Sequence, residues 1–476
     1  MARIAVAGAG MGSLTTAARL AAQGHRVAVY ERAATYGGGV GQFQREGFSF
    51  DTGPALLHLP AVYRDFFVKT SRGIRKDKRT LEQSVELRQV DPAVRHILPD
   101  GREVTLPNAS RSGVIAALDE AFGPNAGERW GAVMNRAREV WEVTRRPLLE
   151  DTLSDAATVF TRDPYPVRRR GLRLLRRDAP TLSATASREL RDPGLAALLG
   201  SYTSAYGYDP SSAPASAAVL AYIEQTFGTW YVRGGMRALM DAVHERCVAQ
   251  GVEFHFGAEV TRIIEKDGRA TGIELDGSIR VEAEAVVDGT ARLDRSGAPE
   301  PPAGLGRFTV LLALRGGRSE GTVHRTVVHG SPTVTVLRPD DPALRPDEEH
   351  EAVTLTVTVP PQGQVDWTVA GYAEEFAKRM VEAAQTAVPG LAERMLWREV
   401  RTPLDIERET GVPGGAVPGP VLAGVGGALL RPGNHGALPG LYSVGGCAHP
   451  GGGLPHAGMS GAIVADLIAG GPGGSR

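Results

Sequence analysis

Residues 3–31 read RIAVAGAGMGSLTTAARLAAQGHRVAVYE, and these residues predict the fold class. The apolar run 3–7 predicts a short buried strand, the helix-forming residues 14–23 predict a helix, and 26–30 predict a second strand. A strand, a helix and a strand within about 30 residues make a β-α-β unit, whose two strands run parallel. The sequence therefore predicts an α/β domain of the Rossmann type.

The turn between the first strand and the helix carries the pattern G-x-G-x-x-S. Gly8 permits the tight turn, Gly10 lets a pyrophosphate approach the backbone, and Ser13 is small enough for helix and strand to pack closely. The free N–H groups at the start of the helix suit phosphates, and Glu31 closes the second strand, where a carboxylate would bind ribose hydroxyls. The alternatives are a glycine-rich turn without a ligand and a surface acid at Glu31. The contacts predicted here are Gly8, Gly10, Met11, Gly12, Ser13, Glu31 and Arg32.

Size and composition narrow the class of protein. A chain of 476 residues suits two or three domains, and its formal net charge of -1 gives no general attraction for nucleic acid. Cys247 and Cys447 form no C-x-x-C pair, which argues against a disulfide scaffold and against a zinc site, and no metal is predicted. We find no signal-peptide pattern and no run of about 18 apolar residues, so we expect a cytoplasmic protein and leave peripheral membrane contact open.

A second glycine cluster, Gly37-Gly38-Gly39, precedes the segment FSFDTGP at 48–54. With the first motif, these segments resemble the flavoproteins that have two dinucleotide-binding domains, and among them the phytoene (carotenoid) desaturase-like family of the amine-oxidase-type superfamily. Members carry a G-G-[RK] loop and an F-D-x-G-P segment that lines the flavin; Gly39 stands here in place of the family's basic residue. The resemblance implies FAD as the cofactor, with contacts from Gly38, Gly39, Gly53, Pro54 and Ala55.

The C-terminal part extends this resemblance. Residues 440–455 read GLYSVGGCAHPGGGLP, which closely follows the family's G-L-Y-x-V-G-x-x-x-H-P-G-G-G-[IVL]-P signature. It implies that strand 441–444 returns to the Rossmann sheet, and that a helix from about Ala457 points its N-terminus at the flavin ring. The segment WYVRGGM at 230–236 matches a further family block. The contacts implied in these segments are Val260, Asp288, Gly445, Gly446, Gly453, Leu454 and Pro455; for Val260, plain sheet packing explains the residue equally well.

The rest of the chain predicts a substrate domain of the α+β type, with an antiparallel sheet and a helical cap. Strands are expected over 308–314, 333–337 and 353–359, and a core-facing helix stripe over 372–384. Residues 60–150 are expected to be helical with a polar hairpin near 98–102, and 291–306 to be a crossing linker. We assign 1–65, 225–292 and 410–476 to a discontinuous FAD domain, 66–224 to a helical part or lid, and 293–409 to the sheet.

Residues 162–177 contain seven arginines with interleaved leucines. This segment is either a basic, partly apolar surface that docks on anionic lipid or a solvated helix face, and its thin apolar content favours the latter.

Three histidines are weak candidates for an acid or base: His449 and His456 in the C-terminal signature region, and His58 after the F-D-x-G-P segment. The sequence fixes no catalytic residue. For His449, hydrogen bonding to loop backbone is the favoured interpretation.

The resemblance implies dehydrogenation of C–C bonds in an apolar polyene or isoprenoid such as a carotene precursor, in carotenoid biosynthesis or secondary metabolism. Since no second dinucleotide motif is found, hydride would pass to flavin N5 and the electrons to oxygen or a quinone. Three alternatives stay open: an oxidoreductase or cyclase acting on another polyene or polyketide-type product, a redox-neutral isomerase, and a non-enzymatic escort protein for prenylated partners. The sequence leaves the oligomeric state unknown.

Overall fold

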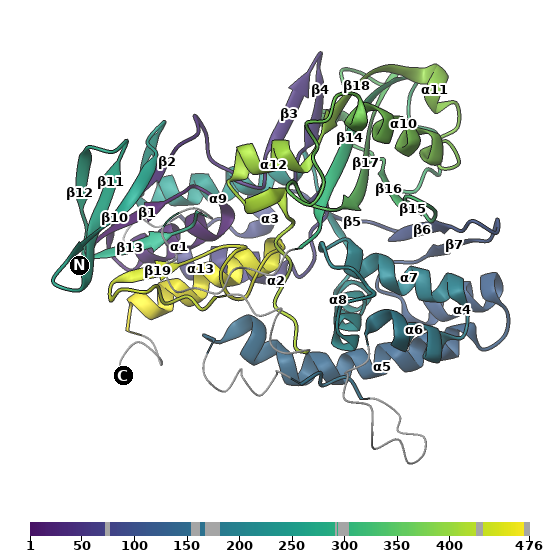
Figure 1. Cartoon of the computed structure of the whole chain (residues 1–476), viewed down its shortest axis with the longest axis horizontal. Coiled ribbons are helices and arrows are strands. Elements are labelled where there is room, and N and C mark those ends of the chain that lie inside the picture. Colours follow the sequence, from purple (N-terminus) through teal and green to yellow (C-terminus); the bar gives the residue numbers. More distant parts are fainter. Residues whose placement is uncertain are drawn as a thin grey trace.

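The protein is described by a computed structural model with an α/β part and a mixed helix-and-sheet part (Figure 1). The structure describes residues 1–71, 77–153, 162–166, 181–290, 293, 304–424 and 432–470. Most of the predicted arginine-rich segment and of the linker 291–306 lies outside these residues. Among the described helices, none has the length and apolar character needed to traverse a lipid bilayer.

The α/β part is built on a five-stranded sheet with the order β19-β13-β1-β2-β9, and all neighbouring strands are parallel. This confirms the predicted Rossmann-type fold. Strands from both ends of the chain lie in one sheet because β13 pairs with β1 on one side and with β19 on the other. The strands are β1 (Arg3–Ala7), β2 (Arg26–Glu31), β9 (Glu253–Phe256), β13 (Ala285–Asp288) and β19 (Leu441–Ser443).

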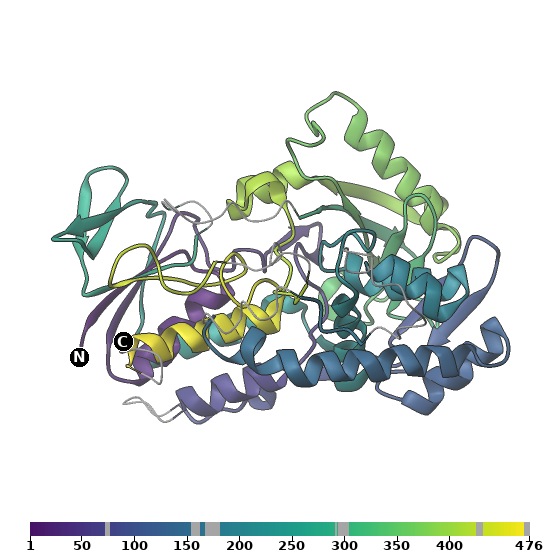
Figure 2. The same ribbon diagram turned by 60° about the horizontal axis from the view of Figure 1, so that its bottom comes forward.

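Three helices pack around this sheet: α1 (Met11–Ala22), α9 (Met236–Gln250) and α13 (Leu454–Ile468). Helices α1 and α13 come from opposite ends of the chain and lie side by side (Figures 1 and 2). A Cβ atom on Gly461 would lie 2.0 Å from Thr15 Oγ1, so a glycine is needed at this crossing. The final helix begins at Leu454 and not at about Ala457, since Pro455 is compatible with its first turn and Gly453 precedes it.

The second large sheet has seven strands in the order β18-β14-β17-β16-β15-β6-β7. The predicted strands are present, and every pair is antiparallel except β15 with β6, which is parallel. Helix α10 (Tyr372–Ala384) packs on this sheet through Met380 and Ala384, as predicted, whereas Tyr372 is 43 % exposed. The strands are β6 (Val94–Ile97), β7 (Glu103–Leu106), β14 (Gly306–Arg315), β15 (Arg325–Val328), β16 (Val334–Leu337), β17 (His350–Val359) and β18 (Met395–Arg401).

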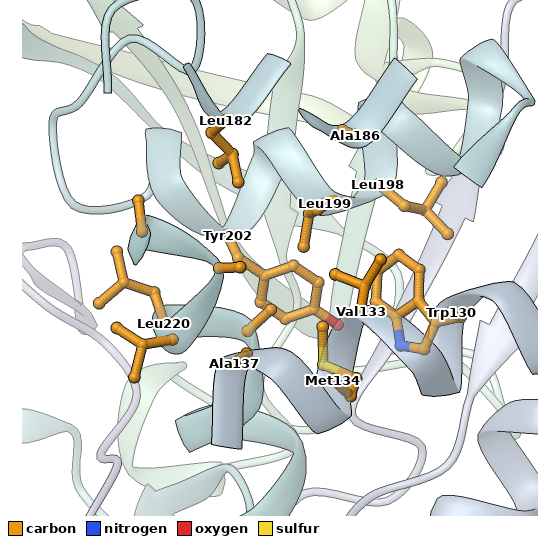
Figure 3. Packing of buried hydrophobic residues seen from close by; sticks show 14 of the residues in the cluster. Trp130, Val133, Met134, Ala137, Leu182, Ala186, Leu198, Leu199, Tyr202 and Leu220 are labelled. Carbon is orange, nitrogen blue, oxygen red and sulfur yellow. The ribbon is translucent and has the colours of Figure 1, made fainter. Parts of the chain in front are cut away.

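The range 60–150 is not wholly helical. The hairpin expected near 98–102 is present as β6 and β7, but it joins the seven-stranded sheet, which its short four-residue strands did not indicate. The helices of the cap surround a core that includes Trp130, Leu198 and Tyr202 (Figure 3). These helices are α4 (Arg111–Phe122), α5 (Ala126–Arg145), α6 (Leu182–Leu190), α7 (Pro193–Ser204) and α8 (Val219–Phe227).

Smaller elements complete the described chain. A three-stranded antiparallel sheet, β10-β11-β12, and the hairpin β3-β4 flank the large sheets, and β5 pairs with β8. Their bounds are β3 (Gln42–Arg45), β4 (Phe48–Asp51), β5 (Leu87–Gln89), β8 (Trp230–Val232), β10 (Val260–Lys266), β11 (Arg269–Leu275) and β12 (Ile279–Glu282). The remaining helices are α2 (Ala61–Thr70), α3 (Leu81–Ser84), α11 (Leu391–Arg394) and α12 (Pro403–Thr410).

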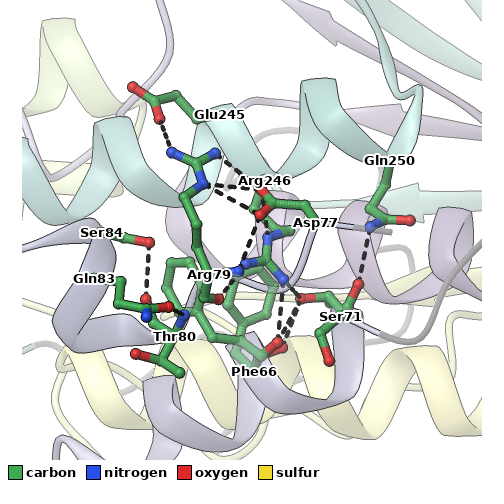
Figure 4. A network of polar contacts seen from close by, with 12 residues as sticks. Phe66, Ser71, Asp77, Arg79, Thr80, Gln83, Ser84, Glu245, Arg246 and Gln250 are labelled. Carbon is green, nitrogen blue, oxygen red and sulfur yellow. Dashed lines mark hydrogen bonds and ion pairs between the residues drawn. The ribbon is translucent and has the colours of Figure 1, made fainter. Parts of the chain in front are cut away.

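One buried arginine ties α9 to α2 and to the segment before α3 (Figure 4). Arg246 is 0 % exposed and donates to the carbonyl oxygens of Phe67 (3.1 Å) and Arg79 (2.6 Å) and to the Thr70 hydroxyl (3.0 Å). Asp77 lies 3.4 Å from its Nε and supplies the opposite charge. The guanidinium therefore satisfies acceptors of several segments at once.

Candidate active site

The amino-terminal glycine loop and the carboxy-terminal glycines meet at one place. A Cβ atom on Gly12 would lie 2.8 Å from the Cα atom of Gly445, and Gly445 N–H donates to Ser460 Oγ over 3.0 Å. From the middle of the chain, Gly289 packs so closely on Ser13 that a Cβ atom would lie 1.9 Å from Ser13 Oγ. A side chain at Gly12 or at Gly289 would collide with these neighbours, so both positions need glycine.

These glycines line a cavity of about 540 Å³ at the start of α1. A Cβ atom on Gly10 would meet no atom within 4 Å, so the backbone of the loop is open toward the cavity. The first turn of α1 contains no acidic residue, which leaves its N–H groups and its positive end free for an anion. The size, the open backbone and the helix start fit the pyrophosphate and the attached groups of a dinucleotide.

Glu31 also lines this cavity. Its Oε2 accepts the Ala9 N–H over 2.7 Å, and its Oε1 accepts the Ala33 N–H over 2.9 Å. The carboxylate thus fixes the glycine loop against the end of β2 at the wall of the cavity. Glu31 is therefore not a free surface acid, which was the alternative left open by the sequence.

The structure brings most of the predicted cofactor contacts together. All of them line the 540 Å³ cavity except Ala55, Pro455 and Asp288. Ala55 and Pro455 line the neighbouring cavity, which is described below. Asp288 lines neither cavity. Its Oδ1 accepts hydrogen bonds from the Thr290 N–H and from the Thr290 hydroxyl, each over 2.8 Å. Asp288 therefore shapes the loop that reaches the cavity.

Several residues that line the cavity were not predicted. Thr290 follows β13, and several residues between 406 and 418 form part of the wall. Arg32 donates to the carbonyls of Arg408 and Glu409 and so holds this segment in place. The lining residues missed are Ala9, Tyr30, Gly37, Val40, Thr52, Ala205, Tyr206, Glu259, Thr261, Gly289, Thr290, Leu293, Arg307, Ile406, Glu409, Thr410, Val412, Ala416, Val417, Pro418, Cys447, Gly452 and Ala457.

The position of Gly39 allows a side chain. It is exposed, lines the cavity, and a Cβ atom there would meet nothing within 4 Å. We expect Gly39→Arg to fold normally and to bind FAD about tenfold more tightly, because a guanidinium there would add a charge-assisted contact to the phosphates or ring. Fluorescence titration of apoprotein with FAD measures the effect, with Gly39→Gln as the uncharged control. Equal affinities of the two variants would contradict the expectation.

A second cavity, of about 580 Å³, adjoins the first. The two share Gly53, Pro54, Gly453 and Leu454, which belong to the segments expected beside the flavin ring, together with Ala205, Tyr206 and Arg307. Its walls come from α7, α8 and the strands β15, β16 and β17. A ligand held here would lie next to the inner end of the cofactor cavity.

The fold places the three candidate histidines in different surroundings. Of the three, only His58 lines the larger cavities, with Nε2 3.6 Å from Glu224 Oε2. His449 is fully buried with Nε2 3.0 Å from the Asp151 carbonyl oxygen, and His456 lines a small void of about 30 Å³. Burial lowers the pKa of both His449 and His456 to about 4, so both are neutral at pH 7. The contact of His449 with loop backbone agrees with the interpretation favoured from the sequence.

Among the residues that the structure describes, no group of three or more His, Cys, Asp or Glu side chains is arranged to hold a metal ion. Of the two cysteines, Cys247 is buried, and Cys447 is partly buried at the wall of the first cavity.

Comparisons with known proteins agree with this geometry. The family described as "Flavin containing amine oxidoreductase" matches residues 14–289. A hydroxyneurosporene desaturase of Rubrivivax gelatinosus is 29% identical, covering 98% of this chain and 93% of the relative, and a 4,4'-diaponeurosporene oxygenase of Staphylococcus aureus is 24% identical, covering 98% and 97%. Among solved structures, an oxidoreductase from Methanosarcina mazei (18% identity, 98% and 100% covered) and a putrescine oxidase bound to putrescine (15%, 98% and 99%) each give a TM-score of 0.66.

The fold and the glycine-lined cavity define an FAD-dependent oxidoreductase. The chain belongs to the family of flavin-containing amine oxidoreductases, and within that superfamily it is a carotenoid desaturase-like protein.

Proposed function

We propose that this protein dehydrogenates C–C bonds in an acyclic polyene of the carotenoid class. The observation that carries the proposal is the pair of adjoining cavities, which share residues of the F-D-x-G-P segment and of the C-terminal glycine signature. The desaturase named above, similar over 98% of this chain, supports the same reaction class. When bound, FAD supplies the acceptor for the hydride that leaves the substrate carbon.

The residues of the chain have a limited part in such a reaction. The glycine loop and Glu31 hold the cofactor, and the walls of the second cavity orient the substrate and exclude water, which is enough when the cofactor carries the difficult step. The proton that leaves the neighbouring carbon goes to a base or to water, and the two electrons pass on to oxygen or a quinone. His58 is the candidate base that lines the substrate cavity.

Anaerobic mixing of the FAD-loaded protein with phytoene and with further acyclic carotenes tests this proposal. We expect the flavin absorbance to bleach with at least one of them and the polyene spectrum to move to longer wavelength as a double bond is added. Isomerised product without bleaching would favour the redox-neutral alternative. Protein that stays colourless after incubation with FAD would favour the escort alternative.

A further inference from the structure

One charged side chain, Arg307 on β14, stands among the residues that line both cavities. The other residues shared by the two cavities are neutral. The Arg307 Nη2 donates to the Ala205 carbonyl oxygen over 2.8 Å. Because Ala205 also lines both cavities, this hydrogen bond holds the guanidinium at the junction between them.

The position of Arg307 in β14 determines the side of the sheet to which it belongs. Side chains alternate between the two faces of a strand, and the next residue, Phe308, packs on the side that α10 covers. The Phe308 ring lies 5.2 Å from that of Trp367 and 4.9 Å from that of Phe376, measured between centroids. Arg307 therefore belongs to the opposite face, and its partner on β17, Thr358, lines the second cavity.

Arg307 has no counter-charge. Within the part of the chain that the structure describes, no carboxylate forms an ion pair with it, whereas Glu224 pairs with Arg325 and Glu409 pairs with Arg401 at the walls of the cavities. Burial lowers the pKa of Arg307, yet a guanidinium stays charged at pH 7. A partly buried cation without a partner is costly, which favours a negative charge on the bound ligand.

The FAD phosphates do not match this position. The glycine loop expected to hold them, residues 8–13, lines the first cavity and not the second. The segments expected beside the flavin ring line both cavities, as Arg307 does. A hydride brings two electrons and one proton to the ring, so the ring gains one negative charge when no second proton follows.

We infer that Arg307 supplies a positive charge that stabilises the reduced, negatively charged flavin ring and so favours hydride transfer from the substrate. The N-terminus of α13, whose first turn has no acidic residue, adds to the same effect. The inference rests on the proposed function, because it concerns the ring that accepts the hydride.

Sulfite tests the inference without a polyene, because its addition to N5 of oxidised flavin leaves a negative charge on the ring. We expect Arg307→Gln and Arg307→Met to bind sulfite about tenfold more weakly than the wild type, since one nearby charge is lost. Arg307→Lys should stay close to the wild-type affinity. A tenfold loss in the equilibrium for two-electron reduction corresponds to a potential lower by about 30 mV, which equilibration with a redox dye measures.

A purely structural role of Arg307 would give another order of variants. The Gln side chain can still donate to the Ala205 carbonyl, whereas Met cannot. In that case Arg307→Met alone would differ from the wild type. Wild-type sulfite affinity in Arg307→Gln, or an equal loss in Arg307→Lys, would therefore overturn the inference.

Arg315→Gln is the matched control, because Arg315 is exposed at the other end of β14, about 25 Å away along the strand, and lines neither cavity. It should bind sulfite as the wild type does, and an equal loss there would also overturn the inference. FAD titration of each variant ensures that flavin-saturated proteins are compared. Absence of bleaching with every polyene would overturn the proposed reaction, whereas the sulfite titration would still decide on Arg307.

Discussion

Gly12→Val is expected to weaken FAD binding by roughly 100-fold or more and to give nearly colourless protein. The added side chain would enter the contact with Gly445, whose Cα and N atoms lie 2.8 and 2.9 Å from the position of a Cβ atom on Gly12. Both atoms belong to backbone, which cannot rotate away as a side-chain end can. The two glycine segments would separate, and with them the two walls of the cofactor cavity. Flavin absorbance per protein and FAD titration of the apoprotein measure the loss.

Gly433→Val is the matched control for this change. Gly433 lies outside the cofactor cavity, and a Cβ atom there would meet nothing within 4 Å. It should retain the wild-type flavin content. If Gly12→Val were as yellow as the wild type, the close approach of the two ends of the chain would not be needed to hold the cofactor.

Arg246→Leu is expected to lower the free energy of unfolding by about 3–5 kcal/mol, since it leaves the buried partners of a charge without compensation. The variant would leave the buried carbonyls of Phe67 and Arg79 without a donor, whereas Asp77 would keep its ion pair with Arg79. Urea unfolding of the FAD-loaded protein, followed by circular dichroism, measures the change.

Arg64→Leu serves as the comparison, because it breaks the exposed pair with Glu82, in which the two side chains are 45 % and 50 % exposed. An exposed pair contributes about 0–1 kcal/mol. A loss for Arg246→Leu no larger than that for Arg64→Leu would show that the buried network is not important for stability.

Some features of the second cavity could not be predicted from the sequence. Tyr206 and His329 belong to no motif, and they lie in segments far apart in the chain. Glu224 and Arg325 are ordinary charged residues until α8 and β15 pack together and bury them. Charge and hydrogen-bonding capacity are local properties, but burial is not, and so the burial of this ion pair could not be predicted.

The β6-β7 hairpin illustrates the same limit in the fold. Its turn residues predicted a hairpin correctly, whereas its parallel pairing with β15 depends on a partner more than 200 residues away in the sequence. Strands of four residues carry too short an alternation to indicate which sheet they join.

A tight turn, a close backbone approach and a strand-helix-strand order each restrict the residue types along one continuous segment. For this reason the sequence alone predicted the Rossmann-type domain and the glycine positions of the cofactor cavity. Only the tertiary structure decided that Gly12 contacts Gly445, that Asp288 supports a loop and does not line the cavity, and that His58 lines the second cavity whereas His449 and His456 do not. Those outcomes depend on which distant backbones pack together, and packing is a property of the whole chain.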